Sequence, residues 1–157
     1  MRKKIQMALE ELINKDIKTA MLAKDNARLR GLRAIKSALL LAKTEKGASE
    51  ILTEEAEIKV LQKLVKQRKE SAEIYIQQNR QDLYQIEKEE QDVIELYLPK
   101  QLGREEIAQK VKEVIDTVGA TSAKDMGKVI GQANKILAGK ADGKTIAEIV
   151  KELLSNL

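Results

Sequence analysis

Apolar residues recur at steps of three and four along almost the whole chain, and this spacing limits the fold more than any other feature. The seam Leu29, Leu32, Ile35 and Leu39, for example, lines one side of an α-helix. No stretch of useful length alternates apolar and polar residues at every second position, as a half-buried strand would. Only one proline in 157 residues is present to interrupt helices. The sequence therefore predicts an all-α fold.

The composition agrees with helices and excludes most catalytic chemistry. Aromatic residues make up 2% of the chain, three tyrosines without Phe or Trp, so the core must be aliphatic side chains and Met. The chain has neither cysteine nor histidine. That lack rules out disulfides, thiolate metal sites, a cysteine nucleophile and the commonest general base. We therefore predict no catalytic residue, no metal site, no cofactor and no activity from the chain alone.

Four long antiparallel helices are predicted in residues 1–98. We place them at about 2–24, from a cap at Asp25 to near Gly47, from Thr53 onward, and at about 81–97. The third begins with acidic residues, which favour the positive end of the helix dipole. The fourth ends before Pro99, because the residue that precedes a proline is disfavoured in the helical conformation.

The stretch LPKQLG at 98–103 marks the predicted boundary between domains 1–98 and 99–157. Three shorter helices follow it and form a compact unit near the lower size limit for an independent core. We expect the first to close at Gly119 in a left-handed cap and the second to open with a capping box at Ser122 and Asp125. The third follows Asp142 and Gly143. The unit either docks on the first domain or is a loosely tethered module.

Charge is unevenly distributed along the chain. Residues 1–52 carry 12 basic and 6 acidic groups, residues 53–102 carry 8 and 11, and residues 103–157 carry 9 and 8. Within this last region, residues 119–147 contain five lysines but only two acidic residues, Asp125 and Asp142. These candidate nucleic-acid-binding residues are Lys124, Lys128, Lys135, Lys140 and Lys144. Lysine binds phosphate as a mobile point charge, although an ordinary solvated face is the alternative.

Glycines occur within the same region, and two of them lie inside a helical pattern. Gly127 and Gly131 each cost about 1 kcal/mol relative to alanine in a helix interior. We favour close approach of a neighbouring helix as the reason. The alternative is access of a phosphate or an RNA strand to the backbone, with Gly139 and Gly143 as further points of approach.

The sequence AGKADGKT at 138–145 fits a loose phosphate-loop pattern. A phosphate loop needs a strand before it and a helix after it, so that backbone N–H groups surround the phosphates. Here a predicted helix precedes the turn, and no strand is predicted to supply an acidic magnesium ligand. We interpret it as a helix end, a turn with two lysines, and a new helix capped by Asp142.

The acidic run of the fourth predicted helix is interpreted as a solvated face. Its carboxylates fall on different faces and are interleaved with Lys88, so a divalent metal site is not predicted. An acid/base pair of carboxylates stays open, although no particular pair stands out. Arg68 falls on the apolar seam of the third helix, where we expect it to extend toward solvent or pair with an acid.

The first residues are basic, but Glu10 and Glu11 interrupt any continuous apolar run. A signal peptide and a membrane span are therefore not predicted. We expect a soluble, cytoplasmic protein without a membrane partner.

Several stretches resemble the YqeY-like protein family across nearly the whole chain. They are AKTEKG, VKQRKESAEIY, YLPKQL, GATSAKDMGKVIG and GKADGKTIAEIVKELL. The family's C-terminal unit is similar to the tail of the B subunit, GatB, of the bacterial glutamyl-/aspartyl-tRNA amidotransferase, a tail implicated in holding tRNA. The resemblance implies an all-α protein with a tRNA-binding type of tail. It carries over Lys124, Gly127, Lys128, Gly131, Gly139, Lys140, Gly143 and Lys144 as motif positions.

The resemblance does not imply the amidotransferase reaction. Family labels that speak of carbon–nitrogen ligase activity with glutamine as amide donor belong to a kinase-like cradle domain that this chain lacks. We therefore expect a non-catalytic accessory protein of translation that binds tRNA or another structured RNA. Two alternatives stay open: an accessory factor of the tRNA-dependent amidotransferase or of an aminoacyl-tRNA synthetase, and a helical protein-interaction module.

Overall fold

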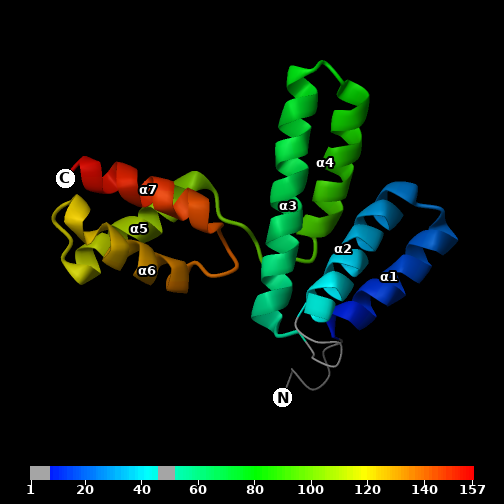
Figure 1. The fold of residues 1–157 in the computed structure, drawn as a ribbon, viewed down its shortest axis with the longest axis horizontal. Helices are drawn as coiled ribbons and strands as arrows, with labels where there is room; N and C mark the ends of the chain where they lie inside the picture. Colours follow the sequence, from blue (N-terminus) through cyan, green and yellow to red (C-terminus); the bar gives the residue numbers. More distant parts are fainter. Residues whose placement is uncertain (1–7, 46–51) are drawn as a thin grey trace. The chain divides into compact units, whose positions relative to one another are not determined.

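A computed structural model describes residues 8–45 and 52–157, and helices are the regular secondary structure within them (Figure 1). No strand occurs in these residues, so the prediction of an all-α fold is confirmed. The helices are α1 (Leu9–Ala23), α2 (Asn26–Glu45), α3 (Glu54–Gln77), α4 (Gln81–Glu95), α5 (Arg104–Val118), the 3₁₀-helix η2 (Ala123–Asp125), α6 (Met126–Ile136) and α7 (Gly143–Ser155). The predicted end of the second helix near Gly47 lies outside the described residues.

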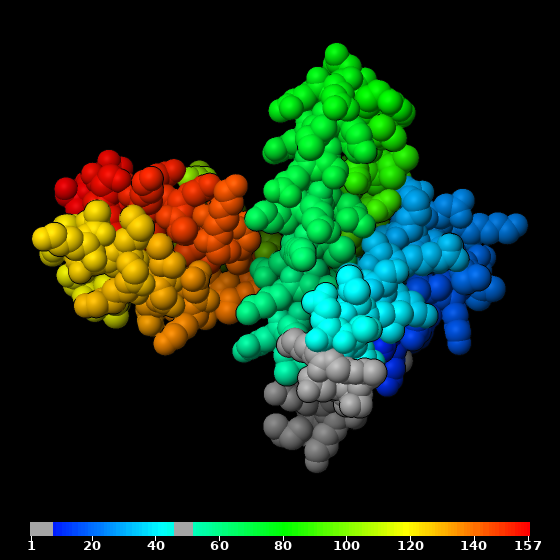
Figure 2. Space-filling model, in the orientation of Figure 1, coloured from blue at the N-terminus to red at the C-terminus, as the bar shows by residue number. Residues whose placement is uncertain are grey.

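The chain divides into two compact units, Met1–Leu98 and Pro99–Leu157, each with its own apolar core. In the space-filling view the first unit runs from blue to green and the second from yellow-green to red (Figure 2). None of the helices in the described ranges is long and apolar enough to cross a bilayer.

The first unit consists of two helical hairpins, α1–α2 and α3–α4, with α2 packed against the second hairpin. Ile13, Leu32, Ile35, Leu61 and Ile94 are fully or almost fully buried at its centre. Local signals define the helix starts as predicted. The backbone N–H of Arg28 donates to Asp25 Oδ1 at 3.1 Å, and that of Ala56 donates to Thr53 Oγ1 at 3.1 Å.

Helices α2 and α4 cross closely at Gly31. A Cβ atom placed on this buried glycine would lie 2.6 Å from Val93 Cβ and 2.7 Å from its Cγ1. These distances are shorter than real Cβ contacts, so only glycine fits here without a shift of α4. The sequence interpretation did not single out Gly31, although it stands within an apolar helical pattern.

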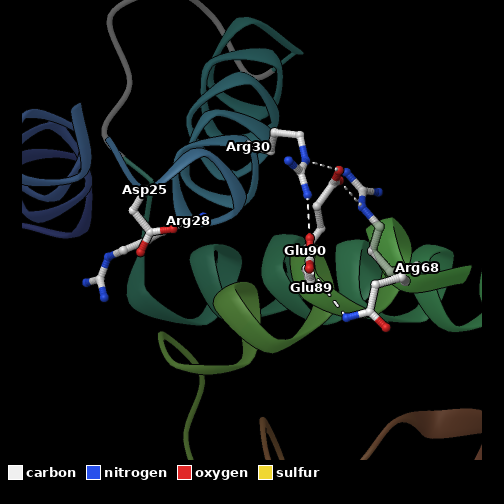
Figure 3. A network of polar contacts seen from close by, with 7 residues as sticks. Asp25, Arg28, Arg30, Arg68, Glu89 and Glu90 are labelled. Carbon is white, nitrogen blue, oxygen red and sulfur yellow. Dashed lines mark hydrogen bonds and ion pairs between the residues drawn. The ribbon is translucent and has the colours of Figure 1, made fainter. Parts of the chain in front are cut away.

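An ion-pair network beside this crossing joins α2, α3 and α4 (Figure 3). Arg30 Nη2 lies 2.7 Å from Glu89 Oε1, and Arg30 Nε lies 3.5 Å from Glu90 Oε2. Arg68 Nε of α3 donates to Glu90 Oε1 at 3.0 Å, with both side chains less than a fifth exposed. The expectation that Arg68 pairs with an acid is confirmed, and the pair fixes α3 against α4.

A hydrogen bond connects α1 to the end of α4. Tyr97 donates its hydroxyl proton to Asp16 Oδ2 at 2.5 Å, and Arg28 Nη2 lies 3.9 Å from the same oxygen. Burial and this hydrogen bond raise the pKa of Tyr97 to about 12. The chain then leaves the first unit directly after this anchored tyrosine.

The second unit is a bundle in which each of α5, α6 and α7 packs against the other two. Val111, Val129, Ala133 and Val150 have no exposed surface at its centre. Helix α5 ends at Gly119, whose φ of 71° is left-handed as predicted.

Candidate nucleic-acid interface

Helix α6 has one buried and one exposed side, and the candidate residues lie on the exposed side. Val129, Ala133 and Leu137 face the core at four-residue spacing. Each residue advances about 100° around an α-helix, so Lys128, Gly131 and Lys135 fall within a sector of roughly 60° on the opposite side. All three are exposed.

Two lysines lie along this side of α6, and a third precedes the helix in η2. Lys128 and Lys135 are separated by about 10 Å along the helix axis, at about 1.5 Å per residue. Lys124, exposed in η2, lies about one turn before Lys128. We call Lys124, Lys128 and Lys135 the lysine row. Lys128 and Lys135 of this row share one side of α6, and Lys124 directly precedes that helix.

The two helix-interior glycines lie beside the row, and nothing packs against them. A Cβ atom placed on Gly127 or Gly131 would meet no atom within 4 Å, and both residues are exposed. The favoured interpretation of close helix approach is therefore wrong for both positions. Gly31, in the other unit, is where a helix approaches a glycine closely. Without a side chain at 127 and 131, the backbone of α6 is open to an incoming group.

The other two candidate lysines lie at the turn between α6 and α7, where Lys140 and Lys144 are exposed. Gly139 permits the turn with a φ of 78°. Asp142 caps α7 by accepting the N–H of Thr145 at 2.9 Å, as predicted. Lys144 lies in the first turn of α7, where the helix dipole is positive. Helix α6 directly precedes this turn, so the AGKADGKT stretch lacks the preceding strand of a phosphate loop.

The approach to η2 differs from the predicted capping box. Ser122 Oγ accepts the N–H of Lys124 at 3.3 Å, as an N-cap should. Asp125 Oδ2, however, accepts the N–H of Thr121 at 2.9 Å, one residue before the Ser122 N–H that a capping box would use. These bonds hold the turn that carries Lys124, which is a 3₁₀-helix rather than the first turn of an α-helix.

The segment before α5 supports the lysine-bearing turn, a role that the sequence interpretation missed. Leu102 donates its N–H to the carbonyl of Lys140 at 2.9 Å. Gln101 Nε2 donates to the carbonyl of Gly139 at 2.7 Å. The sequence interpretation treats this stretch as a domain boundary and a family likeness and predicts no contact for it, because a contact across 38 residues has no local signal in the sequence.

None of the candidate lysines is held by a carboxylate in an ion pair within the described chain. Ion pairs among the described residues of the second unit include those of Arg104 with Glu148 and Glu152, and of Lys110 with Glu113. The five ammonium groups are thus available to an external anion. Across the residues described, no group of three or more acidic side chains could hold a metal ion.

Comparison with known proteins identifies the family. The sequence profile of the Yqey-like proteins matches residues 10–154. Among curated proteins, "Altered inheritance of mitochondria protein 41, mitochondrial" of Clavispora lusitaniae is 35% identical over 134 residues, covering 83% of this chain and 77% of that protein. The protein of the same name from Pyrenophora tritici-repentis is 30% identical over 145 residues, covering 88% and 77%. That of Meyerozyma guilliermondii is 28% identical over 145 residues, covering 90% and 74%.

These relatives correct one prediction from the sequence. All three are named as mitochondrial proteins, which contradicts the expected cytoplasmic location. That expectation rested on the apolar pattern that Glu10 and Glu11 interrupt. Such a pattern argues against a secretory signal peptide or a membrane span, but it does not specify a compartment. The resemblance noted in the sequence is confirmed by the profile match and by the first relative: the chain belongs to the Yqey-like protein family.

Proposed function

We propose that this chain is a non-catalytic accessory protein that binds structured RNA, in the first place tRNA, through its C-terminal unit. The observation that supports the proposal is the lysine row, of which Lys128 and Lys135 lie on the exposed side of α6, with Gly127 and Gly131 open beside them. Ammonium groups without ion-pair partners bind phosphate well, and binding releases the counterions of the RNA.

The composition of the unit favours recognition of the RNA backbone over recognition of bases. No Phe, Trp or Tyr follows Tyr97, so the unit has no aromatic platform on which unpaired bases could stack. Lysine contacts phosphates without reading sequence. The RNA would therefore be recognised by its shape and phosphates. The names of the fungal relatives refer to mitochondria and not to RNA, so the proposal rests on the surface chemistry.

Gel retardation with bulk tRNA over a salt series tests the proposal. If all five lysines contact phosphates, log affinity should fall against log salt with a slope of roughly −3.5 to −4.5. Substitution of the lysine row with alanine should reduce the slope by about 2 to 2.7, and K140A/K144A by about 1.4 to 1.8.

Lysines elsewhere in the same unit provide the matched control. Lys110, Lys112 and Lys151 are exposed on α5 and α7, so K110A/K112A/K151A removes the same charge as the triple substitution of the row. This control should leave the slope within the error of the unsubstituted chain. Absence of retardation at low salt, or equal losses in the two triple variants, would reject the proposed site.

A further inference from the structure

The turn between α6 and α7 is held from outside by the segment that leads into α5. The carbonyls of Gly139 and Lys140 are consecutive along this turn, and both accept hydrogen bonds from that segment. Gln101 Nε2 donates to the carbonyl of Gly139 at 2.7 Å, and the N–H of Leu102 donates to the carbonyl of Lys140 at 2.9 Å. Two neighbouring peptide groups of the turn are therefore fixed by residues from a distant part of the sequence.

Within the turn itself, local hydrogen bonds converge on one carbonyl. The N–H groups of Lys140 and Ala141 both donate to the carbonyl of Leu137, at 2.9 and 3.3 Å. Gly139 has a φ of 78°, a left-handed conformation that glycine adopts without steric cost. Glycine also loses the most conformational freedom when it is ordered, so this position needs further contacts to stay in one conformation. The bond from Gln101 supplies such a contact at the glycine itself.

The side-chain amide of Gln101 has a partner for each of its protons. An amide nitrogen carries two N–H donors. The two acceptors are the carbonyl of Gly139 and the carbonyl of Pro99, the second at 2.8 Å. The bond to Pro99 fixes the side chain against its own backbone and so holds the amide beside the turn. An ionised glutamate could only accept here and a methionine could not donate, so glutamine matches the two carbonyls.

The segment that carries Gln101 has a fixed position in the second unit. Leu102 is half-buried and packs against the apolar core of that unit. The N–H of Gly103 donates to Glu106 Oε1 at 3.2 Å, and its carbonyl accepts the N–H of Ile107 at 3.0 Å at the start of α5. Gln101 thus extends from a segment that is already packed and capped, and its amide connects that segment to the turn.

Two candidate lysines depend on the conformation of this turn. Lys140 directly follows Gly139, and its own N–H and carbonyl bond to Leu137 and Leu102. Lys144 lies in the first turn of α7. Both lysines are exposed, and neither is in an ion pair of the described chain. A turn that fluctuates binds an anion less tightly, because only the fraction of molecules in the competent conformation can bind.

We propose that Gln101 is a positioning residue of the RNA interface, a role that rests on the proposed function of the second unit. By holding the carbonyl of Gly139, it keeps Lys140 and Lys144 in place to meet phosphates of the same RNA, so that less order has to be gained on binding. Gln101 acts through these two lysines and contacts no phosphate itself. The lysine row lies in η2 and α6 and receives none of the bonds from this segment.

Gel retardation of tRNA by the full chain tests this role through the coupling between Gln101 and the lysines. Q101M removes both donors at similar side-chain length, and Q101S removes them without adding an apolar group. Each should weaken tRNA binding about threefold to tenfold. The loss should be the same when the lysine row is substituted with alanine, and it should disappear in a K140A/K144A background. A general loss of stability would weaken binding in both backgrounds.

Gln109 supplies the matched control, because it is an exposed glutamine of α5 whose side chain makes no hydrogen bond within the described chain. Q109M should bind tRNA as the unsubstituted chain does. Hydrogen exchange without RNA reports on the turn directly. The amides of Leu102 and Lys140 should exchange severalfold faster in Q101M than in Q109M. Retained protection at Val111, in the buried core, would show that the unit stays folded.

Three results would overturn this role while leaving the proposed function intact. The first is equal tRNA binding by Q101M and Q109M, and the second is a loss in Q101M that persists when Lys140 and Lys144 are alanine. The third is unchanged exchange at Leu102 and Lys140, since the turn would then not depend on Gln101. Absence of tRNA retardation by the unsubstituted chain would instead reject the proposed function itself, and with it any role of Gln101 in RNA binding.

Discussion

At the scale of single residues, glycines in this chain have opposite roles that the sequence does not distinguish. Gly31 and Gly131 both stand inside helices with apolar residues at three- and four-residue spacing. Gly31 is buried against Val93, whereas Gly131 has open space where a side chain would be. The difference depends on which element packs on each face. The lower helix propensity of glycine at position 131 is therefore not offset by packing. We propose that contact with an external ligand is the reason for glycine at this position.

Gly131→Ala separates stability from binding. Alanine is favoured over glycine in an exposed helix interior, so the free energy of unfolding should rise by about 0.5–1 kcal/mol. If an RNA strand approaches the backbone of α6 here, the added methyl group should weaken tRNA binding severalfold. Urea denaturation and gel retardation measure the two effects. A more stable variant with unchanged affinity would show that the backbone at this position does not take part in binding.

Tyr97 should give the protein a stability change at alkaline pH. Burial first, and then the hydrogen bond to Asp16, raise its pKa from the usual 10 to about 12. The folded state thus holds the proton more tightly than the unfolded state. Its contribution to stability is complete below pH 10 and is lost as the pH rises from about 10 to about 12. Ultraviolet titration should show one of the three tyrosines ionising late, and Tyr97→Phe should remove that phase. Simultaneous ionisation of all three would contradict this assignment.

At the scale of elements, helix ends could be predicted and helix contacts could not. Thr53, Asp142 and Gly119 act within one turn of their own positions, so local spacing was enough to assign them. Glu90, the partner of Arg68, lies 22 residues away along the chain. The sequence could predict that Arg68 pairs with an acidic residue but not which one. Asp125 accepts from Thr121 rather than Ser122 because the turn is a 3₁₀-helix, which the pattern did not indicate.

The α2–α4 crossing supplies a test of packing between elements. Gly31→Ala would place a methyl group 2.6 Å from Val93 Cβ, so α2 and α4 must separate. We expect a loss of about 1–3 kcal/mol in unfolding free energy despite the better helix propensity of alanine. Val93→Ala should recover part of this loss, and a double-mutant cycle from urea denaturation measures the coupling. Additive effects of the two substitutions would show that the helices do not meet at these residues.

At the scale of the whole molecule, the clustering of lysines and the aromatic content differ between the two units. The first has all three tyrosines, and the second has the lysine row and no aromatic residue. The clustering of lysines was visible in the sequence. Their position on one side of α6 depended on the exact helix start at Met126 and on which face packs against α5 and α7. We infer that the second unit is the part of the chain that contacts RNA.

This division predicts that residues 99–157 fold and bind tRNA on their own. The unit has its own buried core, including Val111, Val129 and Val150, and its size is near the lower limit for an independent domain. The isolated fragment should therefore show a helical circular-dichroism spectrum and a cooperative thermal transition.

The fragment 99–157 should also retard tRNA with the same salt slope as the full chain, because the candidate lysines all lie within it. Residues 1–98 alone should not retard tRNA at the same salt, since none of the candidate lysines lies within them. A folded fragment 99–157 with a lower slope than the full chain would mean that cations of the first unit contribute phosphate contacts, and the assignment of RNA to the second unit alone would be wrong.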